Sequence, residues 1–169
     1  MRMNYLSKKD AAKLVKKLRE LSWGKSLSLE KPKRALKIEG DGFTIYKLDG
    51  LLICEKEEAI FPTIHEEYNR EVLEKVPALV VDMGAVPYVA RGADVMRPGV
   101  RKFEGEFDEG EIVVVRDERH FKPLAIAVAL KSRGECVSME KGKIAENIHH
   151  VNDKIWKLVQ ENKRLIDRG

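Results

Sequence analysis

The sequence predicts an α+β fold, in which a small α/β N-terminal domain is followed by a mixed β-barrel with short helices. The first half contains an amphipathic helix followed by stretches that alternate apolar and polar residues, as half-buried strands do. The second half contains short segments rich in Val, Ile and Ala, and several short strands at this spacing favour a closed or nearly closed barrel. We expect an N-terminal domain over residues 1–76, a barrel domain over residues 77–153 and a C-terminal helix over residues 154–169.

The N-terminal half begins with the predicted helix. Ser7 can cap this helix with its hydroxyl oxygen, and apolar residues then recur at helical spacing until the helix ends near Trp23-Gly24. Three alternating stretches predict a short antiparallel meander: residues 34–39, 43–48 and 51–55. Residues 60–63 break this pattern, a short helix is expected over residues 64–75, and Pro77 marks the joint between the domains.

The second half is predicted to contain mainly strands. Four apolar stretches indicate them: residues 79–81, 111–116, 123–130 and 144–151. A short helix is expected over residues 84–90, ended by Arg91-Gly92, and a brief strand between special turns is expected within residues 92–100. Asp153 can cap a last helix, which we expect to fray after Gln160.

Charge is segregated along the chain. Residues 1–37 contain twelve Lys or Arg and three acidic residues, whereas residues 38–76 contain four Lys or Arg and ten acidic residues. One face of the first helix carries five of these bases: Lys9, Lys13, Lys16, Lys17 and Arg19. Four more extend the positive charge beyond the helix: Lys25, Lys31, Lys33 and Arg34. Such a face is typical of a secondary contact with a nucleic-acid backbone, and the alternative is a helix face that is only solvated.

Composition disfavours several protein classes. No apolar run approaches the roughly 20 residues of a membrane span, and the first residues lack a secretory signal, so we expect a cytoplasmic protein with no membrane partner. Cys54 and Cys136 form no CxxC unit and are expected to be buried and reduced. Charged residues make up 36% of the chain and there is a single Gln, a bias typical of proteins from thermophiles.

Few groups are arranged for catalysis. His149 and His150 lie close to Asp153, but adjacent residues on a strand point to opposite faces, so the two imidazoles do not easily converge on one metal ion. Neither cysteine has a histidine at the spacing of a nucleophilic site, and no phosphate-binding Gly-Lys loop, dinucleotide fingerprint or zinc ribbon is present. We therefore predict a protein that is not an enzyme, with no catalytic residue, no metal site and no cofactor.

Four blocks of the second half follow one another at the spacing of a known domain. They are Val81–Ala85, Gly92–Val100, Ala125–Ser132 and Lys141–His150. With them, residues 79–153 resemble the PUA domain, named for pseudouridine synthases and archaeosine transglycosylases. The resemblance implies a small pseudobarrel whose RNA-binding surface comprises the first short helix, the glycine-rich loop after it and the next strand. The implied RNA-binding residues are Gly84, Ala85, Arg91, Gly92, Ala93, Val95, Met96, Arg97, Pro98 and Gly99, with Lys131 and Lys143 extending the surface.

The chemistry of this loop suits contact with an RNA backbone. Its glycines can leave backbone N–H groups free for phosphate or base edges, and Arg91 and Arg97 can bind phosphate through two hydrogen bonds or stack on a base. The alternative role for the two arginines is ordinary surface solubility. Tyr88 offers a ring for stacking, but an aromatic residue between Val86 and Val89 is more typical of a core. We therefore expect recognition of shape and single-stranded ends over readout of sequence.

A narrower resemblance includes part of the N-terminal half. Residues 60–63 and 146–156 are similar to parts of the family of the malignant T-cell-amplified protein and ligatin, in an archaeal-like version. That family acts in translation initiation and ribosome recycling. The resemblance implies that the RNA is small-subunit rRNA or a tRNA acceptor end, and that the small ribosomal subunit and a translation factor similar to the density-regulated protein are partners.

Two other functions remain open at this point. The chain could be an accessory or targeting subunit of an RNA-modification enzyme, because PUA domains commonly direct such enzymes to their substrates. It could also be a scaffold that binds only proteins and has lost its RNA affinity. In each case we expect a monomer.

Overall fold

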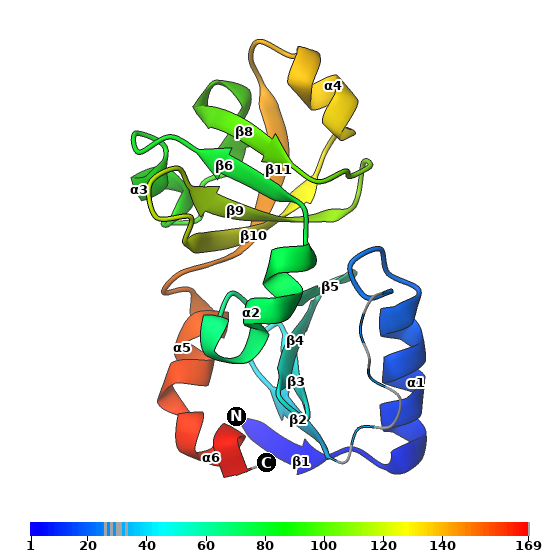
Figure 1. The fold of residues 1–169 in the computed structure, drawn as a ribbon. Helices are drawn as coiled ribbons and strands as arrows, with labels where there is room; N and C mark the ends of the chain where they lie inside the picture. The colour runs from blue at the N-terminus through cyan, green and yellow to red at the C-terminus, as the bar shows by residue number, and fades with distance from the viewer. Residues whose placement is uncertain (26, 28, 30–31, 33, 169) are drawn as a thin grey trace.

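The computed structural model describes residues 1–25, 27, 29, 32 and 34–168, and it confirms the predicted α+β class. The described strands form two sheets, which occupy the lower and upper parts of the molecule in Figure 1. Lys31 and Lys33, which were expected to extend the basic face, lie outside the described residues. No helix in the described part of the chain has both the length and the apolar character needed to cross a membrane.

The N-terminal sheet consists of five antiparallel strands in sequential order. These strands are β1 (Arg2–Tyr5), β2 (Ala35–Glu39), β3 (Thr44–Leu48), β4 (Leu51–Lys56) and β5 (Ala59–Pro62). Helix α1 (Lys8–Arg19) lies on one side of this sheet, and α5 (Lys154–Glu161) and α6 (Lys163–Arg168) lie on the other, as Figure 1 shows. Helix α2 (Glu66–Lys75) stands between the two sheets.

Helix α1 begins where the sequence predicts and ends earlier. The Asp10 N–H donates to the Ser7 hydroxyl oxygen over 3.1 Å, which caps the helix, and the predicted apolar positions from Ala11 to Leu18 are buried. The helix ends at Arg19, and the chain then turns back on itself. A Cβ atom at Gly24 would lie 1.8 Å from the Leu18 carbonyl oxygen, so this tight turn requires glycine.

Two strands of this sheet differ from the expectation. Strand β1 was not predicted; it pairs with β2 through Met3 and Ile38 at the edge of the sheet. Residues 60–63 do not break the pattern as expected, because Ala59–Pro62 forms the opposite edge strand β5. Pro62 is tolerated there because an edge strand does not need every backbone N–H for pairing.

The second sheet curls into a half-barrel, where the sequence predicted a closed or nearly closed one. Its strand order is β7-β11-β10-β9-β6-β8, and β6 and β9 form its parallel pair among the described strands. The strands are β6 (Ala78–Val81), β7 (Val95–Met96), β8 (Val100–Glu104), β9 (Ile112–Asp117), β10 (Pro123–Ala129) and β11 (Lys143–His150). Short helices join them: α3 (Val86–Val89), the 3-10 turn η1 (Arg97–Gly99) and α4 (Arg133–Ser138), the last of which was not predicted.

Side chains on opposite faces of β9 and β10 pack into the barrel core and into the core of the N-terminal domain. Val113 and Val115 point into the barrel core, whereas Val114 between them belongs to the core of the N-terminal domain. Ile126 on β10 likewise lies in the N-terminal core, between two barrel-core alanines. Because successive side chains of a strand point to opposite faces, the same strands supply both cores, and the two domains share a continuous apolar boundary.

The C-terminal segment is ordered beyond the predicted point of fraying. Helix α6 follows α5, and Ile166 is completely buried in the N-terminal core. The Lys47 ammonium donates to the Ile166 carbonyl oxygen over 2.5 Å, and the Tyr68 hydroxyl donates to the Asp167 carboxylate over 2.5 Å. The expected fraying is therefore wrong, because tertiary contacts hold a segment whose local sequence is weakly helical.

Candidate nucleic-acid interface

The predicted RNA-binding residues gather around a groove on one side of the barrel. The groove has a volume of about 440 Å³ and lies between α3 and the β7–η1 segment. Six of the predicted residues line it: Ala85, Ala93, Val95, Met96, Pro98 and Gly99. Its lining is mainly apolar, with Asp82 and Asp94 as the charged members among the described residues. The arrangement is therefore a shallow apolar slot beside a glycine-containing turn.

Two large apolar side chains at this groove are open to solvent. Tyr88 is 64% exposed and Met96 is 49% exposed. The expectation that Tyr88 belongs to the core is wrong, because α3 is a single turn that buries Val89 and turns Tyr88 outward. Tyr88 therefore presents an exposed aromatic ring at the groove.

The turn after α3 requires glycine at one position. Gly92 has a φ of +105°, which L side chains rarely adopt. A Cβ atom there would lie 2.9 Å from Nε2 of His150, so the imidazole of β11 packs directly on this glycine. The close packing of the His150 ring on the Gly92 backbone thus holds the turn against the barrel.

Backbone N–H groups of this turn are already paired. The N–H of Arg91 and that of Ala93 both donate to the Tyr88 carbonyl oxygen, and the N–H of Gly92 donates to the Val89 carbonyl oxygen. These bonds satisfy the last carbonyls of α3, as a helix C-terminus requires. The expectation that the glycines leave amides free for phosphate is therefore wrong for residues 91–93.

The two arginines of the loop have different surroundings. Arg91 is exposed, and its guanidinium has no ion pair with any described residue. Arg97 donates to the carbonyl oxygens of Cys136 (2.8 Å), Val100 (3.1 Å) and Val137 (3.5 Å). Its guanidinium also lies 5.0 Å from the ring centroid of Phe103. These contacts tie η1 to α4, so Arg97 has a structural role and Arg91 is the cation that remains free.

Asn147 and Asp94 hold the loop to β11. The Asn147 side-chain amide donates to the carbonyl oxygens of Val89 and Ala93, each over 3.0 Å, and its backbone N–H donates to Asp94 over 2.9 Å. Lys143 lies 2.8 Å from the second oxygen of Asp94. Burial opposes ionisation of Asp94, but the hydrogen bonds from Lys143 and Asn147 outweigh it and lower the pKa of this carboxyl group. Lys143 therefore holds the loop in place through Asp94, in addition to placing a positive charge beside it.

The other predicted residues stand apart from the groove lining. Gly84 lies in the exposed turn before α3, beside Asp82, whose carboxylate accepts the Ala85 N–H over 2.8 Å. Lys131 is exposed at the start of the segment that leads into α4. Their assignment to the RNA surface stays a prediction.

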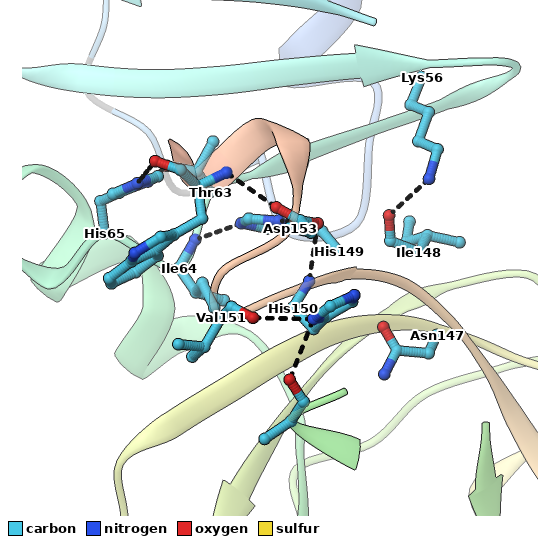
Figure 2. Close-up of polar contacts among 12 residues, drawn as sticks. Lys56, Thr63, Ile64, His65, Asn147, Ile148, His149, His150, Val151 and Asp153 are labelled. Atoms are coloured by element: carbon cyan, nitrogen blue, oxygen red, sulfur yellow. Dashed lines mark hydrogen bonds and ion pairs between the residues drawn. The ribbon is translucent and has the colours of Figure 1, made fainter. Parts of the chain in front are cut away.

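A buried polar cluster joins the barrel to the N-terminal domain next to this interface (Figure 2). His149 is fully buried; its Nε2 accepts the Ile64 N–H over 3.2 Å, and its Nδ1 lies 2.9 Å from the Asp153 carboxylate. Because Nε2 is an acceptor, the ring is neutral with its proton on Nδ1. His65 stacks on Trp156 with ring centroids 4.5 Å apart. These contacts fix the orientation of β11, which in turn positions the predicted RNA-binding loop after α3.

The pKa values of the two histidines reflect this burial. Burial and, to a smaller extent, the neighbouring His149 lower the pKa of His65 to about 4, against the opposing effect of the Trp156 carbonyl. Burial also lowers the pKa of His149, although the Asp153 carboxylate acts in the opposite direction. His150 points the other way, with Nδ1 3.0 Å from the Ala90 carbonyl oxygen. The two adjacent histidines therefore serve different elements, as strand alternation predicts.

The basic face of α1 is a separate surface. All five predicted bases are exposed: Lys9, Lys13, Lys16, Lys17 and Arg19. Lys17 pairs with Glu55 over 3.4 Å, and Arg19 donates to the Leu29 carbonyl oxygen. Figure 1 places α1 and α3 on opposite sides of the molecule. The structure therefore does not merge the two predicted RNA surfaces into one face.

Metal and thiol chemistry have little support in this structure. No group of three or more His, Cys, Asp or Glu side chains in the described part of the chain is placed to hold a metal ion. Cys54 and Cys136 are free and buried, as predicted. Burial raises the pKa of both thiols, which disfavours the reactive thiolate.

Comparison with known proteins identifies the domain. Residues 77–151 match the PUA domain model. Over 156 residues the chain is 33% identical to an uncharacterized protein of Methanocaldococcus jannaschii, covering 90% of this chain and 93% of that protein. It is 30% identical to translation machinery-associated protein 20 of Saccharomyces cerevisiae over 123 residues, covering 69% and 67% of the two chains. The chain belongs to this family of PUA-domain proteins.

The predicted resemblance to a PUA protein of this family is thereby confirmed. Malignant T-cell-amplified sequence 1-A of Xenopus laevis matches at 27% identity over 115 residues, covering 63% of this chain and 59% of that protein. A PUA-domain crystal structure from Aeropyrum pernix, in complex with tartrate, superimposes with a TM-score of 0.77 at 25% identity, covering 94% of this PUA-family chain and 91% of the other. The likeness therefore includes the N-terminal domain as well as the barrel.

Proposed function

We propose that this PUA-family chain is a non-catalytic RNA-binding protein of the cytoplasmic translation apparatus. Its RNA is small-subunit rRNA or a tRNA acceptor end, bound during initiation or ribosome recycling. The apolar slot beside α3 carries the proposal, because it presents exposed Tyr88 and Met96 next to the unpaired Arg91. Unpaired bases of RNA stack on aromatic and apolar side chains, while arginine binds the adjoining phosphate.

The contacts differ from those expected of a loop with free amides. Tyr88 and Met96 receive an unstacked base, and Arg91 binds the backbone beside it. Arg97 positions η1 through its bonds to the α4 carbonyls, and Lys143 orders the loop through Asp94. The basic face of α1 binds a second, distant segment of a large folded RNA, because it lies on the far side of the molecule from α3.

The relatives support the cellular setting. The yeast relative is named as a translation machinery-associated protein. By extension, the small ribosomal subunit and a translation factor similar to the density-regulated protein are the proposed partners of this chain. The heat-adapted composition also favours a thermophilic source.

Titration with defined RNAs tests the proposal. The protein is titrated with small-subunit rRNA, with intact tRNA and with tRNA that lacks its single-stranded 3′ end, at several salt concentrations. We expect binding that weakens as salt rises, because phosphate contacts release counterions. Absence of binding to all three RNAs at low salt would refute an RNA-binding function. Equal affinity for both tRNAs would exclude recognition of the 3′ end and favour rRNA.

Two tyrosine variants locate the site. Tyr88→Ala removes the exposed ring at the slot, whereas Tyr5→Ala removes a ring that is 58% exposed on the distant strand β1. Loss of one stacked base costs on the order of 1–3 kcal/mol, so Tyr88→Ala should weaken RNA binding about fivefold or more. Tyr5→Ala should leave the affinity unchanged. Equal effects of the two substitutions would place the RNA elsewhere.

A further inference from the structure

A second groove lies at the junction of the two domains. It has a volume of about 540 Å³ and is bordered by the β4–β5 hairpin on one side and by β10 and β11 on the other. Its floor is apolar: Leu21, Ala59, Ile60, Ile112, Val128 and Ile148. Four of these side chains are only partly buried, namely Leu21, Ala59, Val128 and Ile148. The margin of the shared core is therefore open to solvent at this groove.

A bulge in β11 shapes this floor. Ile126 pairs with His149 and Ala127 pairs with Asn147, so Ile148 is left without an opposite residue in the β10–β11 ladder. The bulge frees the Ile148 carbonyl oxygen, which accepts a hydrogen bond of 3.1 Å from the Lys56 ammonium (Figure 2). Bulges of this kind redirect side chains and recur beside functional sites. Lys56 thereby fastens the hairpin of the N-terminal domain to the barrel.

Carboxylates surround the apolar floor. Glu57 and Glu58 form the tip of the hairpin, and Glu146 lies on β11; all three are exposed. None of them forms an ion pair with a described residue, and Lys56 is the one base among the described residues that line the groove. Glu57 has a φ of +55°, a conformation that favours glycine or asparagine. The hairpin thus keeps a glutamate at a position where its backbone is strained.

We propose that this groove docks a cationic amphipathic segment of a protein partner. Apolar side chains of the segment cover the exposed floor, and its Lys or Arg residues face Glu57, Glu58 and Glu146. RNA does not fit this charge pattern, because its phosphates would meet three unpaired carboxylates. Complementary charge is the usual basis for partner choice and association rate at such rims.

Helix α1, the most basic element of the chain, would fit the groove of a second copy poorly. The basic helix α1 buries its apolar residues from Ala11 to Leu18 in its own core, so it presents lysines without apolar anchors. A docked segment needs both, because apolar anchors supply most of the binding energy at interfaces. The occupant is therefore assigned to a different protein.

Strand β11 links this groove to the RNA surface. Asn147 binds the loop after α3 through its side-chain amide, while its neighbours Glu146 and Ile148 line the groove. Asn147 also lines the groove, so the two surfaces meet at this residue, and RNA at the loop and a partner in the groove would lie side by side along β11. This inference goes beyond the proposed RNA-binding function and does not depend on it.

Two synthetic peptides of identical apolar pattern test the inference. One carries Lys at every polar position and the other carries Glu. Each is titrated into the ¹⁵N-labelled full chain, and amide shifts are mapped by NMR. We expect the Lys peptide to shift the signals of Glu58, Val128 and Ile148, and the Glu peptide to bind at least about tenfold more weakly, because like charges at a rim cost more than about 1.4 kcal/mol.

Charge reversal provides the matched control. The triple variant Glu57→Lys, Glu58→Lys, Glu146→Lys should lose affinity for the Lys peptide about tenfold and gain affinity for the Glu peptide. The control variant Glu71→Lys, Glu74→Lys, Glu161→Lys makes the same charge change at exposed positions outside the groove. It should behave like the unmodified protein. Circular dichroism of both variants verifies that they are folded.

The outcomes separate this inference from the proposed function. Equal binding of the two peptides, or equal behaviour of the two triple variants, overturns the groove assignment. Self-association that the groove variant abolishes, measured by sedimentation, also overturns it, because the occupant is then a second copy. Retained RNA affinity in the groove variant supports the separation of surfaces. Failure of the unmodified protein to bind RNA would refute the proposed function and leave this inference intact.

Discussion

Acidification should destabilise the fold through the buried histidine pair. His65 is completely buried, with Nδ1 2.9 Å from the Thr63 hydroxyl and Nε2 3.4 Å from the Trp156 carbonyl oxygen. Its pKa is about 4 in the folded protein and about 6.5 in an unfolded chain. Between these values the unfolded state binds more protons, so the free energy of unfolding decreases as the pH falls from about 6.5 to about 4.

The size of the effect follows from the pKa difference. A shift of this size corresponds to about 3 kcal/mol of stability lost by pH 4 relative to neutral pH. His149 adds to the loss, since burial lowers its pKa as well. Hydrogen bonds also lower the pKa of Asp94, Asp117 and Asp153, against the effect of burial, but these carboxylates lose their stabilising contribution only below about pH 5. Above about pH 5 the histidine effect therefore has a pH window of its own.

Urea unfolding at a series of pH values measures this effect. His65→Gln cannot titrate, so its stability should fall about 3 kcal/mol less than that of the unmodified protein between neutral pH and pH 4. The control His120→Gln changes an exposed histidine of the β9–β10 hairpin and should keep the full dependence. The two variants are compared by the slope of stability against pH, because His65→Gln also changes the absolute stability. An unchanged slope in His65→Gln would refute the reasoning.

Three further substitutions test packing, backbone and polar contacts by urea unfolding. Ile166→Ala should cost about 3 kcal/mol because it empties a fully buried site, whereas Leu165→Ala, at a side chain that is 45% exposed, should cost under about 1 kcal/mol. Gly92→Ala should destabilise by about 1–2 kcal/mol and weaken RNA binding, because φ is +105° and the new Cβ meets His150. Asn69→Ala should cost about 2 kcal/mol, because it leaves the buried N–H of Leu52 unpaired and removes the hydrogen bonds from the Asn69 amide to the carbonyl oxygens of Leu52 and Thr63. Small losses in Ile166→Ala and Asn69→Ala would show that these contacts do not limit stability.

Local signals predicted the elements that have strong periodicity. The Ser7 cap and the helical spacing of apolar residues predicted where α1 begins. The alternation of apolar and polar residues predicted β2, β3 and β4. The edge strand β1 was missed because its residues are mostly exposed, so it has no buried period to detect. Strand β5 was missed because Pro62 is usually a strand breaker, and its tolerance at an edge depends on the neighbouring strands.

The candidate site was predicted as a region but not as a set of contacts. The four blocks placed the RNA surface at α3, the turn after it and η1, where the structure has the apolar slot. Arg97 could not be recognised as a structural residue, because two of its three carbonyl acceptors belong to α4 and lie 39 and 40 residues away in sequence. Tyr88 was misassigned because helical spacing predicts burial only when a helix is long enough to have two faces, and α3 has a single turn.

The burial of Ile155, Val159 and Ile166 in the N-terminal core has a consequence for synthesis of the chain. Translation produces the sheet and α1 first, but three of the side chains that fill their core follow the whole barrel in sequence. The N-terminal half therefore leaves the ribosome with part of its apolar surface uncovered, and long-range contacts of this kind form late. The barrel, whose own core is contiguous in sequence, is expected to fold first and to bring the last two helices back to the domain that began the chain.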